Sequence, residues 1–464
     1  MVEPGSSPGL HEHRRGDSHG TLGRHAVDLH VREGGRRLNV RTSLACAVAC
    51  ASLVLIAAGR AVAADAGAAP PVLQAVVVVS RHGVRSPTKL GELDAYAAQP
   101  WPAWPVGPGE LTPHGAMLMT AFGRAYRESF AAAGLRGAEC PPAGSAYVWA
   151  DIDERTRATG EALAAGFAPG CALRVNSSDA GVDPLFHPIP TIAAADPALE
   201  RAMLEGSIGG SPAAVVEAAG PAFSVLETVL GCDRRGATCR SIAGEPSSIV
   251  VSPKSGVASL GGSVALAATA AEDLILEYSE GQAPVGWGRV DRAKLLELSR
   301  LHALKERFEN ETPYMARIGA SNLLMHVRAT IDQAASGVRD AGTRAPVGAR
   351  FVAFIGHDTN LAQIAGALRL SWFLPGFQQN ETPPGGALVF EVWRPVGGGA
   401  AFVRTAFVAQ SFDQMRDATA ATDPRARPLR APVAIPGCPS LDCPLANFDA
   451  IVAASVDPRF VAPW

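Results

Sequence analysis

A run of four valines, 76–79, ends directly in the charged segment Arg81-His82-Gly83-Val84-Arg85. The apolar run begins at about residue 72, and its unbroken character is typical of a strand buried on both faces. Such a strand would normally end in a neutral turn, but this one ends in two arginines around a histidine. The pattern predicts an α/β fold whose first strand delivers a charged loop.

Two later apolar runs, 146–150 and 350–355, also end in ionisable residues. The charged or titratable residues at the three strand ends are Arg81, His82, Arg85, Asp153, Arg155, Arg157, His357 and Asp358. In open parallel sheets, ligands bind outside the carboxyl ends of the strands. If the three strands are neighbours, these side chains are expected to converge on one point.

The converging arginines predict a bound anion, because burying several cations without a counter-charge is costly. A guanidinium group can bind two oxygens of a tetrahedral oxyanion at once, which favours a phosphate group. The net charge of −3 gives the chain no general attraction for nucleic acid or acidic membranes. We therefore expect the partner to be a small phosphate ester.

The histidines and the aspartate of this cluster supply a chemistry for such an ester. A phosphoryl group can move to an imidazole nitrogen, and Asp358 can then protonate the leaving alcohol. A carboxylic acid donor favours activity at low pH. The arginines already supply the positive charge that a metal would bring, so neither metal nor cofactor is expected. The alternative to an enzyme is a protein that binds phosphate esters without turnover. The presence of candidates for both the nucleophile and the acid argues against it.

The N-terminal part of the chain, 1–64, is predicted to be a targeting segment. Arginines precede the apolar run 44–59, and small residues follow it at 61–64. This order is typical of a secretory signal peptide cleaved near 63–64, and the run is short for the alternative, a membrane anchor. The segment 1–35 makes the part before the apolar run unusually long for a signal peptide, so translation is expected to begin after it. The mature protein is expected in the periplasm or outside the cell, away from the membrane.

Six of the eight cysteines lie beyond the apolar run 44–59, and an even number in an exported chain favours disulfides. Of the fifteen pairings that six cysteines allow, pairing neighbours is the simplest. This pairing joins Cys140 to Cys171, Cys232 to Cys239, and Cys438 to Cys443. A zinc site is the alternative, but the spacing contains no paired CxxC motifs.

The central part of the chain, 201–340, is predicted to be mainly helical. It interrupts an α/β domain expected over 65–200 and 341–464, with a mostly parallel central sheet flanked by helices. Three histidines lie on predicted helices without obvious partners, and we expect them to be structural. These are His114, His302 and His326.

Two of the charged motifs resemble those of a known family. The segment Arg81-His-Gly-Val-Arg-Ser-Pro resembles the RHGxRxP signature of the histidine acid phosphatases, and Gly356-His-Asp-Thr-Asn resembles their HD motif. Further stretches resemble the bacterial periplasmic phytases within this family, including 101–106, 151–157, Asp183-Pro-Leu-Phe and 382–386. The resemblance covers roughly residues 70 to 455.

The resemblance implies a fold, an activity and residue roles. It implies a metal- and cofactor-free phosphatase with a mostly parallel α/β domain and a helical domain, acting on phytate through a phosphohistidine. We also expect a monomer. His82 would be the nucleophile and Asp358 the acid. The implied phosphate-binding residues are Arg81, Arg85, Arg155 and His357, with Thr88 and Lys89 at the mouth of the pocket.

The chain also departs from the phytase pattern. Ser86 stands where alanine is usual, with little effect expected. Ser248 stands where the phytases have a glutamate of the pocket rim, with Glu245 nearby, and one long-range disulfide of the family is missing. The three remaining pairs of the family match the neighbour pairing. These departures keep a periplasmic glucose-1-phosphatase or broad sugar-phosphate phosphatase open as an alternative, whereas the signal and the helical insertion argue against a cytosolic mutase-type relative.

Overall fold

The protein is described by a computed structural model, which covers residues 69–89, 91–132, 140–232, 237–419, 423 and 426–462. The predicted targeting segment, 1–64, lies outside these residues. Residues 68–464 form one compact unit. The domain boundaries 65–200, 201–340 and 341–464 stay predictions.

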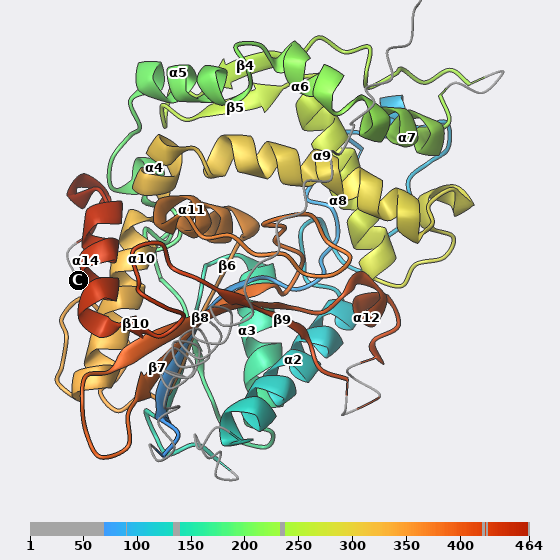
Figure 1. Cartoon of the computed structure of the whole chain (residues 1–464). Coiled ribbons are helices and arrows are strands. Elements are labelled where there is room, and N and C mark those ends of the chain that lie inside the picture. Colours follow the sequence, from blue (N-terminus) through green and yellow to red (C-terminus); the bar gives the residue numbers. More distant parts are fainter. Residues whose placement is uncertain are drawn as a thin grey trace, which may run out of the picture. The chain divides into compact units, whose positions relative to one another are not determined.

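The described residues form one large sheet, one small sheet and helices around them (Figure 1). The strands are β1 (Val72–Arg81), β2 (Ala146–Ala150), β3 (Val175–Asn176), β4 (Ser248–Val251), β5 (Ala258–Gly261), β6 (Phe351–Gly356), β7 (Ala387–Arg394), β8 (Phe402–Ala409), β9 (Leu429–Val433) and β10 (Cys443–Pro444). The α-helices are α2 (Pro113–Ala132), α3 (Glu154–Phe167), α4 (Pro188–Thr191), α5 (Pro197–Ser207), α6 (Pro212–Ala218), α7 (Gly220–Leu230), α8 (Ser263–Ser279), α9 (Arg292–Asn310), α10 (Pro313–Ser336), α11 (Asp358–Leu368), α12 (Phe412–Arg416) and α14 (Leu445–Ser455). Short 3-10 helices are η1 (Asp94–Tyr96), η2 (Val285–Gly288) and η3 (Pro458–Phe460).

The large sheet has the strand order β10-β8-β7-β1-β6-β2-β3, with β9 paired to β8. Strands β1, β6, β2 and β3 run parallel, whereas β7 pairs with β1 in the antiparallel direction and leads to the antiparallel strands β8, β9 and β10. The predicted α/β class, with a central sheet flanked by helices, is confirmed. The three strands whose charged ends drew attention in the sequence are neighbours at the centre of this sheet.

Both faces of β1 are buried, which explains its continuous apolar sequence. Val77 and Val79 belong to a core shared with α10, α11 and α14, whereas Val76 and Val78 face α2 and α3 on the other side. Figure 1 shows these two groups of helices on opposite faces of the sheet. Burying one such valine side chain stabilises the fold by about 1.5–3 kcal/mol, so the strand is a rigid support for the residues after it.

Helices α2 and α3 pack closely because glycines lie at their contact. A Cβ on Gly123 would come within 2.1 Å of the Leu163 carbonyl oxygen, and one on Gly166 within 1.9 Å of the Thr120 carbonyl oxygen. Any side chain at these two positions would push the helices apart. This close contact holds the C-terminal half of α3, the helix that carries Arg155 in its first turn, against α2.

Helices α8, α9 and α10 occupy much of the central part of the chain, which the sequence predicts to be mainly helical. Helix α10 also packs against β1, and α8 and α9 pack against each other. Among the described residues no single helix has the length and apolar character to cross a membrane; only the bent pair 197–218 and 220–230 meets that test, by length and composition alone.

The structure contains three disulfides among its described residues. They join Cys140 to Cys171, Cys232 to Cys239, and Cys438 to Cys443. This is the pairing of sequence neighbours. Each bridge closes a loop and thereby limits the conformations of the unfolded chain.

Candidate active site

The ends of three parallel strands bring the candidate residues to one edge of the sheet. Arg81 pairs in register with Gly356, and Ala150 pairs with Ile355, so the segments after β1, β2 and β6 begin side by side. The side chains of Arg81, His82, Arg85 and His357 are all buried. Arg157, in contrast, is exposed on α3.

His82 is held by its backbone and by its own ring. Its N–H donates to the Gly356 carbonyl at 2.9 Å, and its carbonyl accepts from the Gly385 N–H at 2.8 Å. The ring Nδ1 lies 2.9 Å from the Gly83 carbonyl oxygen. Because a carbonyl can only accept, Nδ1 carries the hydrogen and Nε2 keeps its lone pair in the neutral ring.

The surroundings of His82 favour its neutral form. Burial lowers the pKa of its imidazole well below the usual value, and the positive charges of Arg81, Arg85 and Arg155 lower it further. A neutral imidazole with an unprotonated nitrogen is the form that can attack phosphorus. The same arginines that would hold an anion therefore also keep the candidate nucleophile ready.

Glu272, on α8, lies between two of the arginines. Its Oε1 is 2.6 Å from Arg81 Nη2 and 2.9 Å from Arg85 Nη2. Burial alone would raise the pKa of Glu272, but the charges of Arg85, His302 and Arg81 outweigh it and lower the pKa to about 2. The carboxylate thus stands in for an anion at the position where arginines from one loop converge.

Glu272 was not predicted from the sequence, where the resemblance placed the rim glutamate of the phytases near Ser248. Ser248 begins β4, and Glu245 forms an ion pair with Arg240 instead of reaching the arginine cluster. The available signal was the pair Glu272-Asp273 within an otherwise apolar helix.

Asp358 begins α11 and binds Arg81. Its Oδ2 lies 2.8 Å from Arg81 Nη2, and its Oδ1 accepts from the Thr359 N–H at 2.9 Å. Burial alone would raise the pKa of Asp358, but the charge of Arg81 outweighs it and holds the pKa well below the usual range. In this state Asp358 is an ionised carboxylate that must gain a proton before it can act as an acid.

His302 belongs to this group, contrary to the expectation that it is a structural histidine without partners. It comes from α9, and its Nε2 lies 3.8 Å from Asp358 Oδ2 and 3.9 Å from Glu272 Oε1. The helix position gave no hint of this, because only the packing of α9 over the strand ends brings the ring there.

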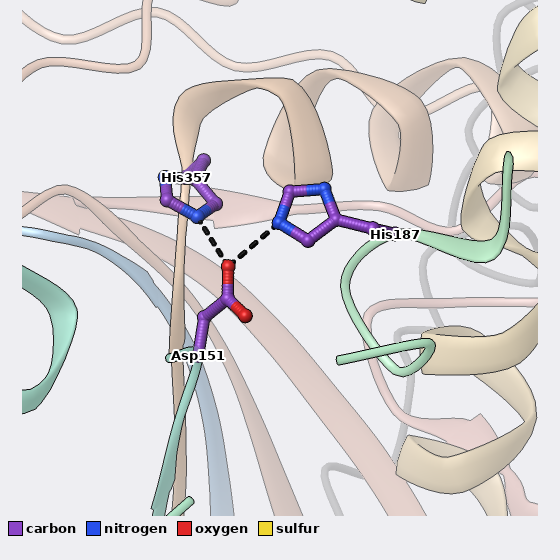
Figure 2. A group of neighbouring side chains, drawn as sticks. All are labelled: Asp151, His187 and His357. Carbon is purple, nitrogen blue, oxygen red and sulfur yellow. Dashed lines mark hydrogen bonds and ion pairs between the residues drawn. The ribbon is translucent and has the colours of Figure 1, made fainter. Parts of the chain in front are cut away.

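His357 contacts two charged residues from the end of β2. Its Nε2 lies 2.7 Å from Asp151 Oδ2, and its Nδ1 lies 3.4 Å from Arg155 Nη2. Arg155 is also bound to Asp153 at 2.6 Å. Asp151 is completely buried and binds a second ring, that of His187, through the same oxygen at 2.7 Å (Figure 2). The sequence analysis assigned no role to Asp151 or His187.

Among the residues that the structure describes, two groups of three side chains bring potential metal-ligand atoms within 4.8 Å of one another. One consists of Asp151, His187 and His357, and the other of Glu272, His302 and Asp358. In both groups the carboxylates already bind imidazole or guanidinium groups of the same site. The arrangement is that of a hydrogen-bonded anion pocket.

The loop after Arg85 leads away from the cluster to the surface. Thr88 and Lys89 are exposed, and Lys89 Nζ binds Glu92 at 3.1 Å. Ser86, by contrast, is buried, and its hydroxyl donates to the Gly107 carbonyl and accepts from the Gly109 N–H. The serine therefore ties two loops together at the base of the segment that carries Thr88 and Lys89.

Replacing Glu272 with glutamine is expected to tighten the binding of inorganic phosphate. The substitution removes the negative charge that occupies Arg81 and Arg85 before an anion arrives. The inhibition constant for phosphate should fall about 5- to 10-fold, equivalent to about 1–1.4 kcal/mol. Steady-state inhibition at constant pH measures this, with Glu245→Gln as the matched control away from the cluster. An unchanged constant in Glu272→Gln would mean that Glu272 does not compete with the anion.

Comparison with known proteins agrees with the motifs and the geometry. The sequence pattern of the histidine phosphatase superfamily (branch 2) matches residues 72–196 and 280–408. The chain is 37% identical to the phytase AppA of Escherichia coli K12 over 399 residues, which cover 82% of this chain and 91% of that protein. It is 28% identical to a glucose-1-phosphatase of Providencia rettgeri over 368 residues, 75% of this chain and 82% of that protein.

The fold agrees with solved structures as well. The phytase of Hafnia alvei in complex with tartrate superposes with a TM-score of 0.78 at 33% identity, covering 85% of this chain and all of that one. The phytase of Citrobacter braakii superposes with the same TM-score at 30% identity and the same coverage. The chain therefore belongs to the histidine phosphatase superfamily, in its second branch.

Proposed function

We propose that this protein is an exported acid phosphatase that hydrolyses phosphomonoesters through a phosphohistidine at His82, with phytate, myo-inositol hexakisphosphate, as its main substrate. The observation that carries the proposal is a neutral, buried His82 surrounded by three arginines, with Asp358 bound to one of them. Similarity to the phytase of Escherichia coli and to the solved phytases supports the choice of substrate.

The residues allow a balanced two-step reaction. In the first step the lone pair of His82 Nε2 attacks phosphorus, the ester P–O bond breaks, and the leaving oxygen takes the proton of Asp358. In the second step the Asp358 carboxylate accepts a proton from water, the water oxygen attacks phosphorus, and the P–N bond breaks. Orthophosphate leaves, and both His82 and Asp358 return to their starting states.

Arg81, Arg85, Arg155 and His357 would hold the phosphate during both steps. Positive groups arranged in advance around the phosphoryl oxygens stabilise the charge of the transition state without reorganisation. The arriving phosphate displaces Glu272 from Arg81 and Arg85. It also adds negative charge beside Asp358, which raises the pKa of that carboxyl and favours the protonated form that the first step needs.

The acids at the mouth of the pocket support activity at low pH. Asp273 and Glu277 line a small cavity together with Lys89, Trp101 and Trp104. Burial raises the pKa of Glu277 to about 7, and burial together with the charge of Glu272 raises that of Asp273. In acid both side chains are neutral and do not repel a substrate with many phosphates, whereas in alkali they would.

A glucose-1-phosphatase or broad sugar-phosphate phosphatase is the second candidate. It is favoured by the similarity to the Providencia rettgeri enzyme and by the same acids, which disfavour a polyanion once they are ionised. The exposed Lys89 and Thr88 would contact the part of the substrate outside the phosphate pocket, where the two substrates differ.

A comparison of kcat/KM for phytate and glucose 1-phosphate tests the proposal. The native mature protein, expected to be a periplasmic or secreted monomer, should prefer phytate at about pH 4–5, below the raised pKa of Glu277. Activity should persist after treatment with a chelator, because the arginines carry the phosphate. A clear preference for glucose 1-phosphate would favour the second candidate function. If neither ester is hydrolysed, the remaining hypothesis is a protein that binds phosphate esters without turnover.

A further inference from the structure

One carboxylate oxygen in this site serves two histidines. Asp151 Oδ2 accepts a hydrogen bond from His357 Nε2 and another from His187 Nε2, both at 2.7 Å, and Figure 2 shows the two rings reaching it from different sides. The other oxygen, Oδ1, accepts from the Ile152 N–H at 2.8 Å. Three donors thus fix the rotation of a carboxylate that has no contact with solvent.

The shared oxygen determines where the ring hydrogens lie. Burial would raise the pKa of Asp151, but the hydrogen bonds and charges of the two histidines hold it well below the usual range, so it is ionised and only accepts. Both rings must therefore carry hydrogen on Nε2. The free side of His357 is then Nδ1, which lies 3.4 Å from Arg155 Nη2 and so faces the arginines.

His187 reaches Asp151 from a turn that is built around Asp183. Asp183 Oδ1 accepts from the Leu185 N–H at 2.9 Å, Asp183 Oδ2 accepts from Trp149 Nε1 at 2.8 Å, and the His187 N–H donates to the Asp183 carbonyl at 3.0 Å. Trp149 belongs to β2, the strand that carries Asp151 at its end. The turn is therefore fixed to the strand whose carboxylate it contacts.

The same turn is fixed to the two helices beside it. Asn360 of α11 donates to the Phe186 carbonyl at 2.8 Å, while its Oδ1 accepts from the His357 N–H at 3.0 Å. Asn322 of α10 donates to the Pro184 carbonyl at 2.8 Å. One asparagine thus holds both the backbone of His357 and the residue before His187, which sets the distance between the two histidines.

We propose that His187 is a positioning residue for phosphate binding, which acts through the shared oxygen of Asp151 to fix the ring of His357 with its Nε2–H on Asp151 and its Nδ1 toward the arginines. In this orientation Nδ1 donates to a phosphate oxygen when the ring carries a hydrogen on both nitrogens. Groups held in this way behind a binding residue determine how precisely it meets its ligand. The inference rests on the proposed function in that His357 is taken to bind the phosphate of the substrate.

His187 can act on Asp151 in two ways, through the positive charge of its protonated ring and through the hydrogen bond that its N–H donates. The groups that face its ring are the carboxylates of Asp151, Asp153 and Asp183 and the ring of His357, whose centroid is 5.4 Å away. Burial lowers the pKa of His187, but these carboxylates outweigh it and raise the pKa above the usual value. A variant that keeps a neutral N–H donor at this place separates the two contributions.

Two variants of the full mature enzyme test the proposal. His187→Leu removes the donor and leaves an apolar side chain, whereas His187→Gln keeps an N–H donor at a similar reach without the charge. We expect His187→Leu to raise both KM for p-nitrophenyl phosphate and the inhibition constant of inorganic phosphate about 10-fold, with a smaller change in kcat. His187→Gln should stay within about 2-fold of the wild type. His114→Leu, which removes a histidine bound to the Met415 carbonyl, is the matched control.

Nuclear magnetic resonance on protein labelled with ¹⁵N at histidine gives a readout that does not depend on turnover. The Nε2–H of His357, bonded to Asp151, should give a persistent signal in the wild type and in His187→Gln, and this signal should be lost or averaged in His187→Leu. An unchanged Nε2–H signal and an unchanged phosphate inhibition constant in His187→Leu would overturn the proposal, as would equal losses in the two variants. If the wild type hydrolyses no ester, the proposed function fails instead, and the Nε2–H signal still reports on His187.

Discussion

Replacing His82 with alanine is expected to abolish ester hydrolysis, with kcat falling at least about 10⁴-fold. The imidazole is the group in the pocket that is neutral, buried and directly surrounded by the three arginines. Without it, phosphorus would have to be attacked by water in a single step.

The His82→Ala protein should still fold and bind phosphate. Its backbone contacts to Gly356 and Gly385 do not involve the ring, and Arg81, Arg85 and Arg155 remain. Isothermal titration with inorganic phosphate checks binding, and circular dichroism checks the fold. A folded variant that binds phosphate and retains more than a tenth of the wild-type kcat would exclude His82 as the nucleophile.

Replacing Asp358 with asparagine is expected to slow the first step by an amount that depends on the leaving group. For an alkyl phosphate, whose departing oxygen needs a proton, kcat should fall about 10²- to 10⁴-fold. For p-nitrophenyl phosphate the loss should be clearly smaller, because nitrophenolate leaves without a proton. Rapid-mixing measurements of the first turnover with both esters give the two rates, and Asp442→Asn, at an ion pair with Arg404, is the control.

The pH dependence of the wild type follows from the same carboxyl group. Arg81 holds the pKa of Asp358 low in the free enzyme, so the proton arrives only with bound phosphate and in acid. The rate with the alkyl ester should therefore fall as the pH rises. In Asp358→Asn this decline of the rate with pH should be weaker. Equal losses for the two esters in Asp358→Asn would show that Asp358 does not protonate the leaving group.

The sequence predicted those parts of the fold and the site that are marked by a pattern within one short stretch of residues. The valine run of β1 reads as a buried strand because both of its faces are covered. The residues after β1 and β6 are recognisable because charges follow directly on long apolar runs. The convergence of Arg81, Arg85, Arg155 and His357 then depends only on β1, β6 and β2 being neighbours, which the topology provides.

The residues that the sequence did not reveal come from elements that reach the site through packing. Glu272 lies in the mostly apolar helix α8, where the pair Glu272-Asp273 was a local signal that was not used. His302 lies in α9, whose many charged residues read as a solvent-exposed face. His187 lies in a turn more than thirty residues beyond Asp151, and nothing local connects the two. Their contacts exist only because two helices and a turn cross the same strand ends, which no periodicity in the sequence records.

Ser248 is a second example of a residue whose role could not be judged from the sequence alone. The serine at this position departs from the phytase pattern, in which the rim glutamate was expected in the loop before β4. The structure places a glutamate on the arginines from α8. The pocket acid is thus supplied by a helix, and the absence of a glutamate at 248 carries no weight against the substrate.

The most direct test of the central claim is to trap the covalent intermediate. The enzyme would be mixed with an ester carrying ³²P, quenched within milliseconds, and digested under conditions that preserve phosphohistidine. The account predicts one labelled peptide, with the phosphate on Nε2 of His82, and no label in His82→Ala. Label on His357 or on any other residue, or full turnover with no trapped phosphate at any quench time, would contradict it.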